Sequence, residues 1–527
     1  LTGTIAAVDT ALDAGVAGTI TGLGNEAVTL TDTSGVAVAA LNTLDGLTTG
    51  KINAGTVTAM SGALTALNTA YASNGITGLG NETLTVSDTG SVAASDLNTL
   101  DSNTSSSVTA ASLSTITGTI AAANTAYGSA GLTLGGDEAI TTADTTANAE
   151  DLNTLNNYTS GVVNADSITT LTGTIADINT AFAADAASSA TISGLGDQAV
   201  EIADTNVLAA DLNTLNGYTS ANIDASTVAV IEGTAAAVNT VYDAKASSPD
   251  DGISGLGNEA VTLTDTTVAA SALTDLDSSD GTTGTIDASS VHTITGLIAD
   301  ANTVYASSDF TGLGAENVTL TDTNNSSNGV SVSTLNTLND YTTGNIDATT
   351  ISLLAGTAAN LNTAYAAGAA TDDGISNLGN EAVTVSDTTL AAATLNTLDG
   401  YTSGTVNAAA VTTLEGTIAA CNTAYASAGI SGLGSEAVTL TDTALTDPSA
   451  LVTLNTKTDK TINADTLSTV SGSLATVKSV YDASVSSPND GISGLGDQAI
   501  TISDTGSVAA SDLTAVASAN SSGTLAA

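Results

Sequence analysis

A short run of alternating apolar and polar residues recurs along this chain. One copy is AVTLTDT at 260–266, and its alternation predicts a β-strand. Successive Asp-Thr pairs that end these runs are 56, 56, 60, 61, 57, 65, 55 and 62 residues apart. A period of this length is typical of a solenoid or another repeat array. The aspartates are Asp32, Asp88, Asp144, Asp204, Asp265, Asp322, Asp387, Asp442 and Asp504.

The segment after each Asp-Thr pair predicts a short helix. In SVAASDLNTLD at 91–101, the residues Val92, Leu97 and Leu100 lie near one helical face. The Asp-Thr pair ahead of the run offers side-chain oxygens at the position of a helix N-cap.

The second half of each repeat shows a stronger helical pattern. A short strand is predicted at 404–408, and an apolar stripe with steps of 3, 4, 3 and 4 follows it, which predicts a helix over 411–425. Gly416 lies inside this stretch, where a glycine suggests close packing against the next coil. The stripe consists of Val411, Leu414, Ile418, Cys421 and Tyr425.

These halves predict an α/β repeat solenoid, with parallel strands and short helices in two strand–helix coils per repeat of about 55–65 residues. An all-β solenoid is the alternative, because Thr and Val are abundant. Length varies in segments that contain Pro249 and Pro488, so we expect exposed loops there.

This period divides the chain into eight full repeats between two partial ones. The chain begins and ends inside a unit, so we expect it to be a piece of something longer or a processed product. The units are 1–20 (partial), 21–76, 77–132, 133–192, 193–253, 254–310, 311–375, 376–430, 431–492 and 493–527 (partial).

The composition narrows the classes of partner. The chain has no Trp, two Phe and eleven Tyr, which favours a thin core of small aliphatic side chains. Five basic and 54 acidic residues give a formal charge of −49, and none of the basic residues is Arg. This balance argues against nucleic-acid binding and predicts that the chain gathers divalent cations. The sequence contains no apolar run long enough to span a membrane.

Two recurrent motifs lie around the alternating run. The Gly-Leu-Gly motif precedes the strand, which indicates a tight turn rather than a dinucleotide site. An acidic or amide residue follows the motif, six positions before the recurrent Asp. These residues are Glu26, Glu82, Glu138, Gln198, Glu259, Glu316, Glu381, Glu436 and Gln498.

Stacked coils are expected to place these groups in ladders. The nine aspartates of the Asp-Thr pairs, with neighbouring carboxylate and carbonyl oxygens, are therefore candidate Ca²⁺ ligands. Turn or N-cap roles for the same aspartates are the favoured alternative. The two Gln replacements argue against a charged ligand set, and no other cofactor is predicted.

One aromatic residue ends each second-half helix. We interpret it as a core residue that closes the helix against the following loop, with a stacked binding platform as the alternative. These residues are Tyr71, Tyr127, Phe182, Tyr242, Tyr305, Tyr365, Tyr425 and Tyr481.

The sequence offers no familiar catalytic constellation. Cys421, the only cysteine, takes the position of Leu67 and Ile178 in other repeats, so we expect a buried apolar role. His292, the only histidine, is expected at the surface. Together with the lack of Arg, this predicts a protein that is not an enzyme.

The repeat texture, in segments such as SVAASDLNTLD and GISGLGNEAVTLTDTT, resembles that of the giant repetitive surface proteins of marine cyanobacteria, a group implicated in swimming without flagella. The resemblance covers nearly the whole chain. It implies an exported, non-enzymatic protein at the cell surface.

The sequence therefore favours a structural function. We expect an extracellular rod or filament segment that associates with itself end to end or side by side, through unpaired strand edges or bound cations. A repetitive adhesin stalk that binds a glycan or another surface is the alternative.

Overall fold

The computed structural model describes residues 1–245, 252–278, 280–323, 329–368, 374–485 and 491–527. The chain forms two compact units, residues 1–262 with 278–285 and residues 263–277 with 286–527. Pro249 and Pro488, which were predicted to lie in exposed loops, fall outside the described residues.

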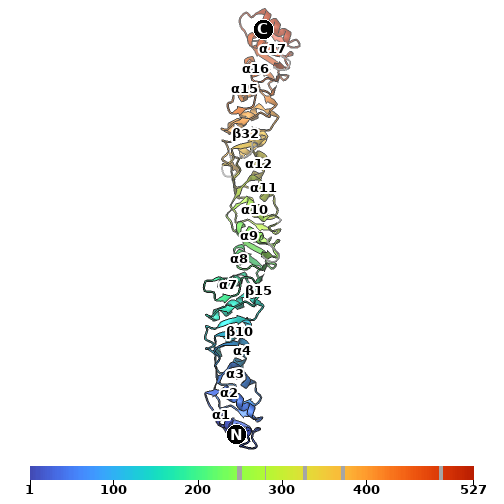
Figure 1. Ribbon diagram of the computed structural model, residues 1–527. Helices are drawn as coiled ribbons and strands as arrows, with labels where there is room; N and C mark the ends of the chain where they lie inside the picture. The colour runs from blue at the N-terminus through green and yellow to red at the C-terminus, as the bar shows by residue number, and fades with distance from the viewer. Residues whose placement is uncertain (246–251, 279, 324–328, 369–373, 486–490) are drawn as a thin grey trace. The chain divides into compact units, whose positions relative to one another are not determined.

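Each of these two compact units, which contain several repeats, is an α/β solenoid, and this confirms the predicted fold class. Short parallel strands alternate with short helices, and within the first unit α2, α3 and α4 follow one another in chain order (Figure 1). No helix in the described part of the chain has the length and apolar character needed to cross a membrane.

The helices form two series that alternate along the chain. The first-half helices follow the Asp-Thr pairs, and the second-half helices end with or shortly after the recurrent aromatic residue. The first-half helices are α2 (Val38–Leu47), α4 (Ala94–Asn103), α6 (Ala149–Tyr158), α8 (Ala209–Asn216), α10 (Ala270–Leu276), α12 (Val332–Tyr341), α14 (Ala392–Tyr401), α16 (Pro448–Asn455) and α18 (Ala510–Ala519). The second-half helices, with the equivalent α1, are α1 (Ile5–Val16), α3 (Leu64–Ala72), α5 (Ile120–Gly128), α7 (Ile175–Ala186), α9 (Ala235–Lys245), α11 (Ile298–Ala306), α13 (Ala358–Gly368), α15 (Ile418–Ala426) and α17 (Leu474–Val485).

More than one strand precedes each helix of a repeat, where the sequence predicted one. The extra strands are two to four residues long, too short to show an alternation of their own. In repeat 133–192 the chain order is β12 (Ala139–Thr142), β13 (Thr146–Asn148), α6, β14 (Val163–Asn164), β15 (Thr170–Gly173), α7 and β16 (Ile192–Ser193).

The strands stack into parallel sheets that overlap along the chain. One sheet of the first unit has the order β13-β15-β17-β19-β21, where β17 is Ala199–Ile202, β19 is Asn222–Asp224 and β21 is Gly252–Ser254. Adjacent strands of this sheet pair Ala147 with Leu171, Leu171 with Val200, Val200 with Ile223 and Ile223 with Ile253. These five side chains are between 0% and 5% exposed. They form one column of a thin aliphatic core, as the composition predicted.

The helix predicted over 411–425 is only partly correct. Thr413–Gly416 is strand β35, and helix α15 begins at Ile418. Leu414 is buried from the strand and Ile418 from the helix, so their spacing imitates one continuous helical stripe. Gly416 has a φ of 156° at the end of the strand, and an added Cβ there would lie 3.2 Å from the Cβ of Ala392. Close packing at this glycine is therefore correct, but the neighbour belongs to the preceding coil rather than the next one, and the predicted place of the glycine inside a helix is wrong.

The same error affects the first-half helix. Val92 belongs to strand β8 (Ser91–Ala93), and α4 buries Ala94, Leu97 and Leu100. The buried positions therefore recur every three residues along one narrow face of the helix.

Candidate functional site

The recurrent Glu or Gln beside the Gly-Leu-Gly turn forms a polar site that is buried at every recurrence from Glu82 onward, whereas Glu26 is only partly buried. Glu82 is 0% exposed, and its Oε2 accepts hydrogen bonds from the N–H groups of Gly80 at 2.8 Å and Asn81 at 3.2 Å. Gly78 and Gly80 have φ angles of 88° and 136°, which confirms the predicted glycine turn into the strand. The turn thus points backbone donors at the carboxylate.

The recurrent tyrosine of the second-half helix completes this site. Tyr71 of α3 donates its hydroxyl hydrogen bond to Oε2 of Glu82, with the two oxygens 2.6 Å apart. The corresponding distances are 2.9 Å for Tyr127 to Glu138 and 3.0 Å for Tyr305 to Glu316. The same bond joins Tyr242 to Glu259, Tyr365 to Glu381, Tyr425 to Glu436 and Tyr481 to Gln498.

Burial beside a carboxylate disfavours ionisation of these tyrosines. Loss of solvent raises the pKa of Tyr127 well above its ordinary value, and the hydrogen bond to Glu138 raises it further. Burial and the charge of Glu316 act on Tyr305 in the same direction. The neutral phenol is therefore the donor at each pair. These bonds support the interpretation of the tyrosines as residues that close the helix against the next loop.

At the two glutamine positions, a hydrogen-bond donor takes the place of one of the glutamate's acceptor oxygens. Gln198 accepts the N–H of Gly196 at its Oε1, 2.6 Å away, as glutamate does in other repeats. Its Nε2 donates to the carbonyl oxygens of Ile168 and Gly194 and to Oδ1 of Asp197, at 3.2, 2.8 and 3.0 Å. Amide hydrogens thus face three oxygens where a glutamate has only a second oxygen.

The residue before this position is an aspartate at both glutamines and an asparagine at four of the seven glutamates; Asp137, Ala315 and Ser435 precede the other three. Both glutamines follow an aspartate, in Asp197–Gln198 and Asp497–Gln498, whereas Asn81 precedes Glu82. Asn-Glu and Asp-Gln each carry one negative charge, so the exchange conserves the local charge. The other Asn-Glu pairs are Asn25–Glu26, Asn258–Glu259 and Asn380–Glu381.

A threonine from the next coil binds the main chain of the same position. Thr159 donates its hydroxyl to the carbonyl oxygen of Glu138 at 2.7 Å, and it accepts the N–H of Gly161 at 2.9 Å. This role was not predicted from the sequence, although the recurrence of Thr before Ser, Thr or Asp at this position was a visible signal. The other threonines that donate to this carbonyl are Thr48, Thr104, Thr219, Thr282, Thr342, Thr402 and Thr458.

The structure places the candidate metal-binding aspartates at helix N-termini. Oδ2 of Asp88 accepts the N–H of Leu64, the first residue of α3, at 2.7 Å. The capped helix belongs to the preceding coil, so the prediction that these aspartates cap the helix that follows them is wrong. The spatial neighbour of the strand end is the previous helix. The aspartates with this bond are Asp32, Asp88, Asp144, Asp204, Asp322, Asp387, Asp442 and Asp504.

No aspartate of this series joins a cluster that resembles a familiar metal centre. Within the described ranges, no group of three or more His, Cys, Asp or Glu side chains is placed to hold an ion. Metal binding by these aspartates therefore stays a prediction.

A ladder of asparagine side chains connects neighbouring helices. Asn98 of α4 donates from Nδ2 to the carbonyl oxygen of Ala122 in α5 at 2.8 Å, and Asn124 of α5 donates to Asp151 in α6 at 3.0 Å. Equivalent bonds start at Asn42, Asn68, Asn153, Asn179, Asn213, Asn302, Asn336, Asn396 and Asn422. The asparagines of the recurrent Asn-Thr pairs therefore connect neighbouring coils.

Stacked aromatic pairs lie at the ends of four second-half helices. The ring of Tyr127 lies 5.5 Å from that of Tyr158, with an angle of 5° between the planes. Tyr158 is 41% exposed, so one ring of the pair reaches solvent. The other pairs are Phe182–Tyr218, Tyr305–Tyr341 and Tyr365–Tyr401.

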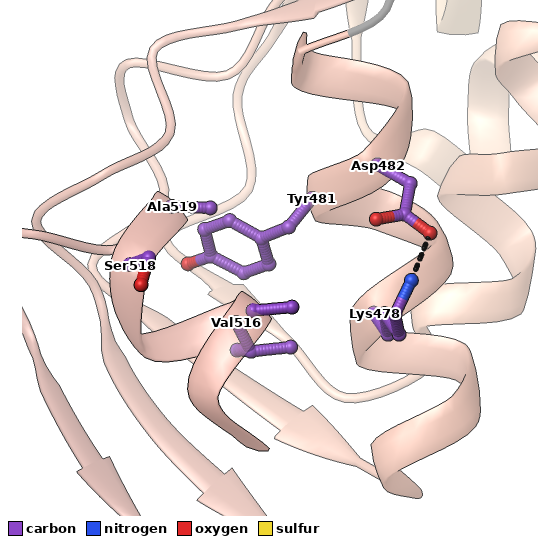
Figure 2. Close-up of a pocket in the computed structure, with 7 residues that line it drawn as sticks. Lys478, Tyr481, Asp482, Val516, Ser518 and Ala519 are labelled. Atoms are coloured by element: carbon purple, nitrogen blue, oxygen red, sulfur yellow. Dashed lines mark hydrogen bonds and ion pairs between the residues drawn. The ribbon is translucent and has the colours of Figure 1, made fainter. Parts of the chain in front are cut away.

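A cavity takes the place of such a pair beside α17. Its volume is about 480 Å³, and Lys478, Tyr481, Val516 and Ala519 are among the residues that line it. Figure 2 shows the Tyr481 ring directed from α17 toward the segment of α18 that carries Val516 and Ala519. Ala519 occupies the sequence position of Tyr158, so no second ring covers Tyr481.

The single cysteine and the single histidine show no sign of activation for catalysis. Cys421 is buried as predicted, and burial raises the pKa of its thiol to about 12, which leaves it protonated at neutral pH. His292 is exposed, as expected, and its Nδ1 lies 2.7 Å from the carbonyl oxygen of Ser290.

No protein-family model matches this sequence, and no curated protein matches it. The resemblance to cyanobacterial surface proteins therefore stays a prediction.

Proposed function

We propose that this chain is a non-enzymatic structural protein, a segment of an extracellular rod or surface fibre that associates with itself. The proposal rests on one observation: the recurrent polar side chains form hydrogen bonds between neighbouring coils. Asp88 binds the helix of the preceding coil, Asn98 binds the following helix, and Thr104 binds the carbonyl of Glu82 one coil back. The polar groups that define the repeat thus join coil to coil, which suits a polymer-forming role.

The charge of the chain supports a dependence of association on ions. A formal charge of −49 opposes lateral contact between two copies, and salt screens this repulsion. Divalent cations are therefore proposed as partners in side-by-side association. The extracellular location rests on the resemblance of the repeat sequence alone.

A second candidate function is a stalk that binds a glycan or another surface. The half-exposed rings of Tyr158, Tyr341 and Tyr401 are 41%, 38% and 39% exposed, and each is held by a stacked partner. Rings held in this way present flat apolar faces, against which the apolar face of a sugar can pack.

Electron microscopy of the purified chain, with Ca²⁺ and with a chelator, tests the first candidate. Filaments with a regular axial repeat are expected with Ca²⁺, and their dispersal by the chelator would support ion-dependent association. Single short particles in both conditions, at every protein concentration, would overturn self-association.

A matched variant separates the two candidates. The triple substitution Tyr158→Ser, Tyr341→Ser and Tyr401→Ser removes the half-exposed rings and leaves their stacked partners in place. A filament former should still polymerise. A glycan-binding stalk should lose its signal on a glycan array, whereas a control with Thr43→Ser, Thr99→Ser and Thr397→Ser at exposed helix positions should keep it.

A further inference from the structure

One oxygen of Glu82 has no partner although it is buried. The three donors described above all bind Oε2, and Oε1 has no hydrogen-bond partner. The residue is 0% exposed, so solvent does not compensate. A buried carboxylate oxygen without a partner is costly.

The glutamine coils show what faces this oxygen. At Gln198, the group in the place of Oε1 is Nε2, which donates to Ile168, Gly194 and Asp197. Gln498 repeats the arrangement, with Nε2 at 3.1 Å from the Leu467 carbonyl, 3.0 Å from the Gly494 carbonyl and 2.7 Å from Oδ1 of Asp497. Each glutamine thus supplies hydrogens to two main-chain carbonyls and one side-chain oxygen.

The backbone around Glu82 has the same conformation as the backbone around Gln198. The two turn glycines have φ angles of 88° and 136° before Glu82, and of 88° and 135° before Gln198. The strand that follows is held in the same register, because Thr83 N donates to Thr58 O at 3.0 Å and Ala199 N donates to Thr169 O at 3.0 Å. The counterparts of Ile168, Gly194 and Asp197 are therefore Val57, Gly78 and Asn81.

We propose that Oε1 of Glu82, the carbonyl oxygens of Val57 and Gly78 and the amide oxygen of Asn81 bind one Ca²⁺ ion. Carboxylate, carbonyl and amide oxygens are the ligands that Ca²⁺ takes in proteins. In the Glu82 coil the ion would bind the oxygens whose counterparts in the Gln198 coil accept hydrogen bonds from the amide of Gln198. Asn81 is exposed, so water bound to the ion on the side of Asn81 would complete its coordination.

A ligand set with one carboxylate predicts a weak site. Its dissociation constant should lie around 10⁻⁴–10⁻³ M, the range of extracellular calcium modules. The site is distinct from the aspartates of the Asp-Thr pairs, and its existence does not depend on whether the chain forms filaments.

The same chain contains internal controls. The Gln198 coil fills the corresponding space with amide hydrogens and should bind no ion. In the Glu138 coil, Oε1 accepts the N–H of Gly135, so that oxygen already has a donor. Among the glutamates of the described residues, Glu82 alone has a buried oxygen without a hydrogen-bond partner, so the proposal is confined to its coil.

Crystals of the full chain soaked with Tb³⁺ as a calcium probe test the site directly. An anomalous peak is expected about 2.3–2.6 Å from Oε1 of Glu82, and no peak is expected beside Gln198. Absence of a peak at Glu82, or peaks of equal height at both places, would overturn the proposal.

A solution measurement keeps the test independent of crystals. Addition of 10 mM Ca²⁺ should slow hydrogen exchange at the Gly80 amide several-fold in the natural chain. The double variant Asn81→Asp, Glu82→Gln copies the natural pair Asp197–Gln198 and should lose this response. An equal effect of Mg²⁺, or of NaCl at matched ionic strength, would show general screening and overturn the site, as would an unchanged exchange rate in the natural chain.

Discussion

The hydroxyl of Tyr71 lies 2.6 Å from Oε2 of Glu82, eleven residues further along the chain, and donates a hydrogen bond to it. The bond closes the end of a helix against the turn that begins the next repeat. In the described chain, Phe182 is the one aromatic residue of this series without a hydroxyl, and the repeat that follows it has Gln198 in place of the glutamate. Pairs of this kind are accessible to single substitutions.

Removal of the hydroxyl in Tyr71→Phe should weaken the coil locally. A hydrogen bond to a charged group contributes about 1.5–3 kcal/mol, and its loss leaves a buried carboxylate with fewer donors. Because repeat proteins need not unfold in one step, the measurement is the opening free energy of the Gly80 and Asn81 amides by native-state hydrogen exchange.

The matched control for Tyr71→Phe is Phe182→Tyr. The added hydroxyl meets the Gln198 position, as Tyr481 meets Gln498, and the opening free energy should change by no more than about 0.5 kcal/mol. Equal losses in both variants, or none in Tyr71→Phe, would contradict a stabilising role for the bond.

Alkaline pH should destabilise the folded chain. Burial and neighbouring acidic groups raise the pKa of seven helix tyrosines above the ordinary value near 10: Tyr71, Tyr127, Tyr242, Tyr305, Tyr365, Tyr425 and Tyr481. The folded state therefore binds more protons than the unfolded state above pH 10. The stabilisation is fully present below pH 10 and is lost as pH rises through the folded-state pKa.

Absorbance at 295 nm and far-UV circular dichroism, recorded together on one sample, measure this effect. The ionisation of the buried phenols should coincide with loss of helix signal. Ionisation of all eleven tyrosines near pH 10 with the dichroism unchanged would show that the buried bonds do not oppose ionisation.

The substitution Asp88→Ala should destabilise the start of α3. Loss of a side-chain acceptor at a helix N-terminus costs about 0.5–2 kcal/mol, and the Leu64 amide should exchange faster by the corresponding factor. Asp88→Asn keeps an acceptor oxygen and should retain most of the protection. If Asp88→Ala instead lowers Ca²⁺ affinity and leaves the Leu64 amide unchanged, the metal prediction for this aspartate gains support over the cap.

The substitution Asn98→Asp should loosen the contact between α4 and α5. The carboxylate keeps the shape of the amide but cannot donate to the Ala122 carbonyl, so we expect a loss of about 1–3 kcal/mol. Hydrogen exchange in α4 and α5 measures the loss. Thr99→Ala, at the adjacent exposed position, serves as the control and should stay within about 0.5 kcal/mol.

The thiol of Cys421 should report opening of its coil. Burial raises its pKa to about 12, so its reaction with a disulfide reagent at pH 8 should be slow and should accelerate with denaturant. Thr423→Cys in a Cys421→Val background places a thiol at an exposed position of α15 and should react at once. Fast reaction of Cys421 in the native chain would contradict its burial.

The fold class was predictable because the signal is repeated. Each copy of the alternating strand confirms the others, and the small aliphatic residues of the column from Ala147 to Ile253 are evident from composition. The exact helix start was not predictable at Ile418. The chain passes there from strand to helix through Thr417, and the buried side chains on either side happen to continue a helical spacing.

The site was only half visible in the sequence. The recurrence of Tyr71 and Glu82 marked both residues, but their pairing depends on the positive φ of Gly78 and Gly80, which bring the chain back to the helix. The partner of Asp88 was harder to foresee. It lies 24 residues earlier, in a neighbouring coil, and local capping rules concern only the helix that follows.

The backward direction of the aspartate cap has a consequence for the order of events during synthesis. A chain that emerges N-terminus first releases α3 before Asp88, and Asn98 before the Ala122 carbonyl that accepts its hydrogen bond. Each newly made coil therefore lacks the capping bond that completes it until the next coil has followed. Folding should proceed as a moving front that trails the point of emergence by about one coil, with only the newest coil vulnerable to proteases at any moment.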